Sequence, residues 1–291
     1  MFGEGGGGKT YIALRWVLSL ATGIPFLTSK PTRTVKCLFI DYEDDPAEGN
    51  DRIQKLCGGT KANIDLDLLH ANILYFNPAG IPFADLVPTL TECIRANGVE
   101  FVLLDSAALA CGGEPEKADS ATRYFNSLAK LGVTSLTIAH ETKSENHDHV
   151  FGSIFWRNSA RNIWNAQSET NEADNRKISF GLFHRKCNHS AKRSAVSLEI
   201  FHGVGVVEVR PASQEAWGTG LSVPARIVAM LKQRPMELGE LKDKLDDLTK
   251  DEIGVSLNRL KARGVVVQPA GRGGPWRLEC MDECMDDLQK P

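Results

Sequence analysis

The first ten residues of the chain contain a complete phosphate-binding loop. Residues 3–10 read Gly-Glu-Gly-Gly-Gly-Gly-Lys-Thr, which fits the pattern G-x-x-x-x-G-K-[ST]. Glycine at five of the six loop positions lets the backbone turn tightly, so that its N–H groups can point at phosphate oxygens. The apolar, helically spaced residues 10–21 predict a helix whose N-terminus strengthens phosphate binding. The alternative, a flexible glycine-rich linker, does not explain this helix.

This loop predicts ATP and Mg²⁺ as ligands. Lys9 is expected to reach the β- and γ-phosphates, and the Thr10 hydroxyl to coordinate Mg²⁺. The expected nucleotide-binding residues are Gly3, Glu4, Gly5, Gly6, Gly7, Gly8, Lys9, Thr10 and Tyr11.

Composition predicts a cytoplasmic protein that does not enter a membrane. No apolar run approaches the roughly 18 residues of a membrane span. The N-terminus is glycine-rich, unlike the basic and then apolar start of a signal peptide. Seven cysteines at scattered positions favour a reducing compartment.

Helices and strands are expected to alternate along residues 1–211, which indicates an α/β fold with a mostly parallel sheet. The predicted strands are 35–41, 73–76, 99–105 and 133–139. The predicted helices are 47–56, 83–96 and 120–131. Further strands at 178–183, 195–201 and 204–209 are expected to be antiparallel at the sheet edge. Because only Met1 and Phe2 precede the loop, the first strand is expected to be missing or truncated.

A second, smaller domain is predicted for residues 222–279, after a Pro-, Ser- and Gly-containing linker. Three helices followed by two short strands around a glycine-rich turn resemble a winged helix-turn-helix. Thr249 and Glu252 have the spacing of a capping box at the start of the third helix. These residues include eleven Lys/Arg against eight Asp/Glu, a surplus of three positive charges. Residues 280–291 form an acidic tail.

Three predicted strand ends carry the candidate chemistry. Asp105 ends an apolar strand, and a carboxylate at the carboxyl edge of the sheet would hold Mg²⁺ together with Thr10. Glu43 is the candidate general base, although Asp41, Asp44 and Asp45 compete with it and the whole segment could be a solvated acidic turn. His140 ends the strand 133–139 and could contact the γ-phosphate. A purely structural role for His140 remains open.

Together these motifs resemble the RecA-like ATPases, and most of all the plasmid RepA-type hexameric helicases and their phage-borne relatives. The resemblance covers about residues 1–205. It rests on the loop, the strands that end in Asp-Tyr-Glu-Asp-Asp and Leu-Leu-Asp-Ser, and residues 137–143 followed by Gly152-Ser153. It implies that Glu43 activates water and that His140 couples the γ-phosphate to DNA-contacting loops.

The same resemblance implies a basic finger that reaches the neighbouring subunit's site. The matching residues 184–189 read His-Arg-Lys-Cys-Asn-His, so that Asn188 stands where relatives often have arginine. Lys186 or Arg185 is therefore the candidate cation in trans. A zinc site at His184 and Cys187 is not expected, because these residues point to opposite faces of a strand.

Nucleic-acid contacts are predicted in both domains. The polar segment 143–153, with Lys143, would face single-stranded DNA in the channel of a ring, although an ordinary surface loop is the alternative.

Duplex DNA is expected at the winged helix. The candidate residues there are Arg259, Lys261, Arg263 and Arg272. Asp251 and Glu252 at the start of that helix leave a protein-contact role open. Arg157 and Arg161 flank Trp156 and Trp164 at helical spacing and are expected to be packed structure.

Two functions follow from these observations. The first is an ATP-driven DNA motor, a replicative helicase of plasmid or phage type that assembles as a homo-oligomer with a hexamer as the expected form. The second is a non-translocating ATP-dependent DNA-binding regulator or helicase-loader-like accessory protein. The altered finger and the short N-terminus favour the second function.

Overall fold

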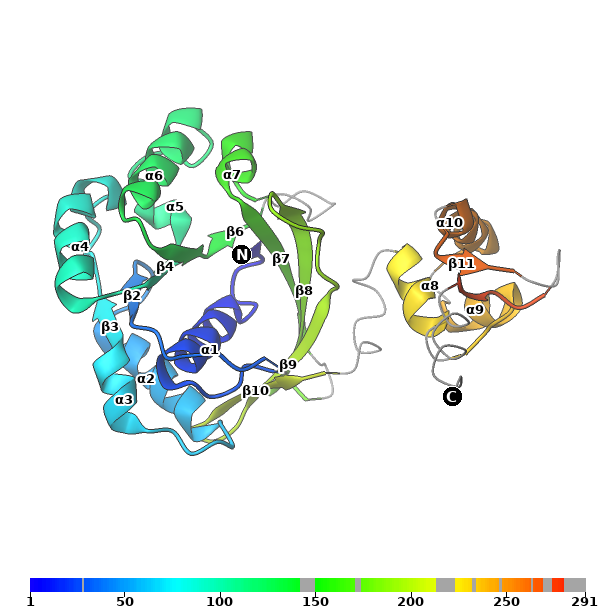
Figure 1. Cartoon of the computed structure of the whole chain (residues 1–291), viewed down its shortest axis with the longest axis horizontal. Helices are drawn as coiled ribbons and strands as arrows, with labels where there is room; N and C mark the ends of the chain where they lie inside the picture. The colour runs from blue at the N-terminus through cyan, green and yellow to red at the C-terminus, as the bar shows by residue number, and fades with distance from the viewer. Residues whose placement is uncertain are drawn as a thin grey trace, which may run out of the picture. The chain divides into compact units, whose positions relative to one another are not determined.

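The computed structural model describes residues 1–27, 29–141, 150–170, 174–212, 223–231, 234–245, 248–262, 264–268 and 274–279. The chain divides into two units, Met1–Ser213 and Gln214–Pro291 (Figure 1). Each unit has its own cluster of buried apolar side chains.

A parallel group of strands forms one half of the first unit. Its order is β3 (Ile73–Phe76), β2 (Cys37–Asp41), β4 (Phe101–Asp105) and β5 (Thr134–Thr137). All three neighbouring pairs are parallel, as the alternation of helices and strands predicted. In this register Asp41 lies opposite Asp105, so the carboxyl ends of β2 and β4 meet at one edge.

The other strands form a mixed group with the order β10-β9-β8-β7-β1-β6. Their bounds are β1 Phe2–Gly3, β6 Ala139–His140, β7 Asn162–Thr170, β8 Lys177–Cys187, β9 Val196–His202 and β10 Val207–Pro211. The pairs β8–β9 and β9–β10 are antiparallel, as predicted for the sheet edge. The strand β7, which was not predicted, also pairs antiparallel with β8. Ile138 separates β5 from β6 and donates its N–H to the carbonyl of Leu104 (2.9 Å). The segment from β5 to β6 therefore lies between β4 and β1.

A strand of two residues precedes the phosphate-binding loop, where the sequence predicted a missing or truncated strand. β1 covers Phe2–Gly3, is buried, and pairs in parallel with both β6 and β7. Two residues are enough for a strand here because neighbours on both sides supply its hydrogen bonds.

Seven helices are described in the first unit. They are α1 Lys9–Thr22, α2 Pro46–Gly58, α3 Leu66–Asn72, α4 Phe83–Asn97, α5 Ala107–Ala110, α6 Ala118–Lys130 and α7 Ile154–Ser159. The helices α4, α5 and α6 share a core with Leu38 and Ile40 of β2. Because side chains alternate along a strand, Cys37 and Phe39 point to the opposite face. The helix α1 lies inside the curve of the strands and contacts α2 and α3 (Figure 1). The short helices α3, α5 and α7 were not predicted.

The helical spacing of residues 156–164 is misleading, because a helix ends and a strand begins within it. Trp156 belongs to α7, whereas Trp164 belongs to β7. Both tryptophan side chains are packed. Arg157 and Arg161, which were expected to be packed, are exposed instead. The Trp156 indole donates to the Pro115 carbonyl (2.9 Å), and Trp164 stacks on His184 with ring centroids 4.2 Å apart.

The second unit contains α8 (Val223–Leu231), α9 (Leu238–Lys244), α10 (Lys250–Ala262) and the antiparallel pair β11 (Val266–Val267) and β12 (Arg277–Leu278). The predicted capping box at the start of α10 is confirmed. The N–H of Glu252 donates to Thr249 Oγ1 (3.3 Å), and the N–H of Thr249 donates to Glu252 Oε2 (2.8 Å). The identity of this unit as a winged helix stays a prediction. Among the described residues, no helix has the length and apolar character needed to span a membrane.

Candidate nucleotide-binding site

The glycines of the loop are required by its backbone and its neighbours. Gly6 and Gly8 have φ values of +73° and +89°, in the left-handed region that favours glycine. A Cβ on Gly3 would lie 2.0 Å from the backbone oxygen of Ala166 in β7. The loop therefore passes from β1 into α1 in a conformation that other residues cannot adopt without strain.

Lys9 lies inside the loop. Its side chain is buried, and Nζ donates to the carbonyl of Gly3 (3.1 Å) and to that of Glu4. Burial lowers the pKa of Lys9, an effect that the nearby Asp105 and Glu43 oppose. The backbone carbonyls thus hold the ammonium at the place where phosphate oxygens would be bound.

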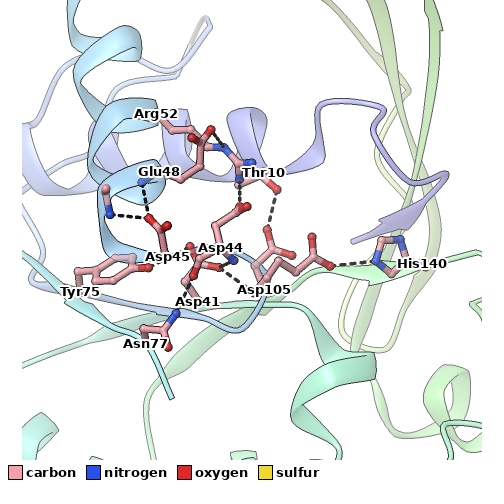
Figure 2. A network of polar contacts seen from close by, with 12 residues as sticks. Thr10, Asp41, Asp44, Asp45, Glu48, Arg52, Tyr75, Asn77, Asp105 and His140 are labelled. Atoms are coloured by element: carbon pink, nitrogen blue, oxygen red, sulfur yellow. Dashed lines mark hydrogen bonds and ion pairs between the residues drawn. The ribbon is translucent and has the colours of Figure 1, made fainter. Parts of the chain in front are cut away.

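Thr10 and Asp105 meet at the N-terminus of α1. Thr10 Oγ1 donates to Asp105 Oδ2 (2.6 Å), although the two residues are far apart in the sequence (Figure 2). Asp105 is 1% exposed, and its Oδ1 has no hydrogen-bond partner within the described part of the chain. Burial, together with the charge of Glu43, raises the pKa of Asp105 to about 7. A hydroxyl and a partly unsatisfied carboxylate are oxygen ligands that suit Mg²⁺, so the residues fit this ion.

The acidic turn after β2 is organised by Asp41. Asp41 is buried, and its Oδ1 accepts the N–H groups of Glu43 and Asp44, both at 3.1 Å. The Tyr75 hydroxyl donates to Asp41 Oδ2 (3.3 Å). Burial raises the pKa of Asp41, whereas these backbone hydrogen bonds lower it. Asp41 therefore shapes the turn.

The side chains of Asp44 and Asp45 bind to helix α2. Asp44 forms an ion pair with Arg52 of α2. Asp45 caps α2 and accepts the N–H groups of Ala47 (2.8 Å) and Glu48 (3.0 Å). The sequence left four carboxylates in residues 41–45 as candidates for the general base. Three of them, Asp41, Asp44 and Asp45, have structural partners, and Figure 2 shows these contacts.

Glu43 is the member of this turn that contacts His140. Glu43 Oε1 lies 3.0 Å from His140 Nε2, and this hydrogen bond is the main cause that lowers the pKa of Glu43. His140 lies in β6 opposite Gly3, and a Cβ built on Gly5 would be 3.8 Å from its Nδ1. An ionised carboxylate beside the phosphate-binding loop can accept a proton from water.

Tyr11 lies one position beyond the loop and is half-buried. Its ring meets His202 edge-on, with centroids 5.4 Å apart, and the Arg52 guanidinium lies 5.9 Å from its centroid. Burial raises the pKa of Tyr11. Tyr11 thus lies where α1, α2 and β9 meet, and its ring contacts His202 and Arg52, so its role in nucleotide binding stays a prediction.

The two candidate finger residues contact their own chain. Lys186 Nζ donates to the carbonyls of Arg157 (2.9 Å), Asn158 (2.9 Å) and Ala160 (2.7 Å), at the C-terminal end of α7. Arg185 Nη2 donates to the buried Asn165 (3.2 Å). These contacts are structural, so a role of either residue in trans stays a prediction that the single chain does not support.

The predicted DNA-binding residues are described only in part. Arg259 and Lys261 are exposed on α10, and the Lys261 ammonium lies 5.9 Å from the centroid of the Trp276 ring. Lys143, Arg263 and Arg272 lie outside the described residues.

One residue at the site was missed by the sequence reasoning. Asn77 directly follows β3 and donates to the backbone of the acidic turn (2.6 Å to the Asp44 carbonyl). A polar residue at the end of a predicted strand was the signal that identified Asp105 and His140, and it applies equally to Asn77.

Comparisons with known proteins agree with this geometry. A family model described as an AAA domain matches residues 1–146. A crystal structure of a KaiC-like protein from the hyperthermophilic archaeon Pyrococcus horikoshii OT3 is similar in fold, with a TM-score of 0.52 and 12% sequence identity. The match covers 72% of this chain and 87% of that protein. No curated protein sequence matches the chain.

Proposed function

Because this chain belongs to the AAA domain family and has a RecA-like ATPase fold, we propose that it is an ATP-hydrolysing DNA motor, a replicative helicase of plasmid or phage type. The observation that carries the catalytic part is the convergence of Lys9, Thr10, Asp105 and Glu43 at one edge of the sheet. The DNA part rests on the resemblance in sequence and on the exposed basic residues of α10.

The loop binds the triphosphate. Its N–H groups and the N-terminus of α1 face the phosphate oxygens. Lys9 exchanges the carbonyls of Gly3 and Glu4 for oxygens of the β- and γ-phosphates. Thr10 and Asp105 would hold Mg²⁺, which neutralises charge on the phosphates when it is bound.

Glu43 acts as the general base. Its carboxylate accepts a proton from the water that attacks the γ-phosphorus, and the bond between that phosphorus and the β–γ bridging oxygen breaks to release ADP and phosphate. His140 holds the Glu43 carboxylate by the 3.0 Å hydrogen bond. Because burial and hydrogen bonds already engage Asp41, Asp44 and Asp45, Glu43 is the acid that can serve in this role.

The first experiment compares Glu43→Gln with Asp44→Asn in ATP turnover. Glu43→Gln is expected to bind ATP normally and to lose on the order of 10²-fold or more in turnover, as for removal of a general base. Asp44→Asn is the matched control, because it removes a neighbouring carboxylate that is paired with Arg52. Lys9→Ala is expected to lose most nucleotide affinity. A larger loss in Asp44→Asn than in Glu43→Gln would show that the wrong carboxylate was chosen.

A second function, the non-translocating DNA-binding regulator or helicase-loader-like accessory protein, is favoured by one contact. A ring-shaped motor needs a positive side chain that reaches the neighbouring subunit's site. Lys186, a candidate for this role, instead donates to three carbonyls of its own chain. ATPase rates with and without single-stranded DNA, together with strand separation and native mass spectrometry, distinguish the two. Stimulated hydrolysis, unwinding and a hexameric ring support the motor. DNA binding without unwinding supports the regulator.

Duplex binding at the second unit is tested with Arg259→Ala in the full chain. Arg259 is exposed on α10, and contacts to phosphates make affinity fall with added salt. Lys130→Ala, which removes an exposed cation from α6, is the matched control. Fluorescence anisotropy with labelled duplex should show weaker binding for Arg259→Ala alone. Equal duplex affinity in wild type, Arg259→Ala and Lys130→Ala would instead favour a role of the second unit in binding another protein.

A further inference from the structure

The loop after β3 holds the Glu43 turn on both sides of this residue. Asn77 Nδ2 donates to the backbone carbonyl of Asp44 (2.6 Å), and the Tyr42 hydroxyl donates to the backbone carbonyl of Ile81 (3.1 Å). Tyr42 and Asp44 are the chain neighbours of Glu43. Figure 2 shows Asn77 below Asp41, on the side of the turn away from Thr10.

Asn77 is itself held in one orientation. Its Oδ1 accepts the N–H of Ala79 (2.8 Å), which is an Asx-type turn. The turn brings Ala79 and Gly80 into left-handed conformations with φ values of +51° and +81°. A flipped amide would lose both hydrogen bonds, because Oδ1 cannot donate to a carbonyl and Nδ2 cannot accept an N–H.

The backbone at Glu43 is therefore fixed by three hydrogen bonds, two to Asp41 in β2 and one from Asn77 in the loop after β3. Asp41 of β2 accepts the N–H groups of residues 43 and 44, and Asn77 after β3 binds the carbonyl of residue 44. With both ends of this short segment fixed, the Glu43 side chain is aimed at His140. Displacement of a catalytic group by about 1 Å can cost on the order of 10²-fold in rate, so such fixation has a kinetic consequence.

We propose that Asn77 is a positioning residue for hydrolysis, which acts by fixing the backbone that carries Glu43. This inference rests on the proposed role of Glu43 as general base. Asn77 acts through the backbone of its neighbours and contacts neither the nucleotide nor the attacking water.

The test measures kcat and KM for ATP in Asn77→Ala and Asn77→Asp. Asn77→Ala removes both side-chain hydrogen bonds without adding a charge. Asn77→Asp has a near-native shape and keeps the acceptor for the N–H of Ala79, but it loses the donor to Asp44 and adds a negative charge beside the acidic turn. Both variants are expected to lose about 10-fold or more in kcat, while KM and ADP affinity change less than about twofold. Asn97→Ala is the matched control, because Asn97 Nδ2 donates to the Cys93 carbonyl (2.9 Å) at the end of α4.

The same substitutions are then made in Glu43→Gln. Residues that act as a unit are not additive, so Asn77→Asp should add little to the loss in Glu43→Gln. Unchanged kcat in Asn77→Asp, an equal loss in Asn97→Ala, or a full additional loss in the Glu43→Gln background would each overturn the inference. Full turnover in Glu43→Gln alone would overturn the proposed function, and with it the role of Asn77.

Discussion

Replacement of Asp105 by asparagine is expected to stabilise the nucleotide-free protein at alkaline pH, while it abolishes magnesium-dependent ATP hydrolysis. Asp105 is 1% exposed, and Oδ1 lacks a hydrogen-bond partner within the described residues. Burial and then the charge of Glu43 raise its pKa from 3.8 to about 7. An ionised Asp105 is therefore costly until a cation binds.

The sign of the pH dependence follows from this shift. An acid whose pKa is raised by folding binds its proton more tightly in the folded state. The stability that it contributes is present in full below pH 3.8 and is lost as the pH rises through about 7. At about 1.4 kcal/mol per pKa unit, the total loss is on the order of 4 kcal/mol, of which about 2–3 kcal/mol falls between about pH 5 and 8.

Asparagine cannot ionise, so the unfolding free energy of Asp105→Asn does not undergo this loss as the pH rises. The amide oxygen can still accept the Thr10 hydroxyl, but the amide N–H₂ enters a buried place, which costs about 1–3 kcal/mol. That cost does not depend on pH. The difference in unfolding free energy between Asp105→Asn and wild type should therefore rise by about 2–3 kcal/mol from about pH 5 to 8.

Urea denaturation in EDTA at a series of pH values measures this difference. Asp174→Asn is the control, because the hydrogen bond from Arg176 lowers the pKa of Asp174 in the folded protein and Asp174 does not contribute to the shift at Asp105. Its charge contributes stability above the unfolded pKa, and that contribution is lost as the pH falls through the folded value, which is the opposite direction. A difference for Asp105→Asn that is constant with pH, or that falls as the pH rises, would refute the assignment of a raised pKa to this residue.

Two further substitutions test contacts around the site. Lys186→Met removes three hydrogen bonds at the end of α7, so it should lower the unfolding free energy by about 1–2 kcal/mol in urea, whereas Lys192→Met should not. Lost turnover with unchanged stability would instead indicate a cation in trans. Gly7→Ala places a Cβ 2.2 Å from Ser168 Oγ and should lower both ATP affinity and the melting temperature. Ser168→Ala should restore part of the loss, because the next atom of that residue lies at 3.2 Å; independent effects of the two substitutions would contradict the contact.

The edge of the sheet that carries the site was predictable from sequence. The loop of residues 3–10 required a strand before it and a helix after it, and parallel strands end at the same edge of their sheet. Strand-end residues were therefore expected beside the loop, and Asp105, Glu43 and His140 lie there. The longer helices of the first unit and its parallel strands were predictable, because apolar runs of five or six residues alternate with longer amphipathic segments. The short helices α3, α5 and α7 and the strand β7 were not predicted.

The separate roles of the four neighbouring acidic residues were not predictable from sequence. Asp41, Glu43, Asp44 and Asp45 have similar side chains within five positions, and their roles depend on which strand or helix end each side chain meets. Lys186 is a comparable case. In the sequence it matches a finger position, but the carbonyls that it binds belong to a helix about 30 residues earlier.

Local sequence thus specifies the chemistry of the site, because a glycine-rich loop and a strand-end carboxylate are properties of short segments. The partners of each side chain come from residues distant in the sequence, and these are brought together by strand register and helix packing. The 2.6 Å contact of Thr10 with Asp105 spans 95 positions, and the 3.0 Å contact of Glu43 with His140 spans 97. Short sequence patterns predict that these strand ends lie beside the loop, but they do not specify which side-chain atoms bind each other. Burial, which raises the pKa of Asp105, likewise arises only when the whole sheet is assembled.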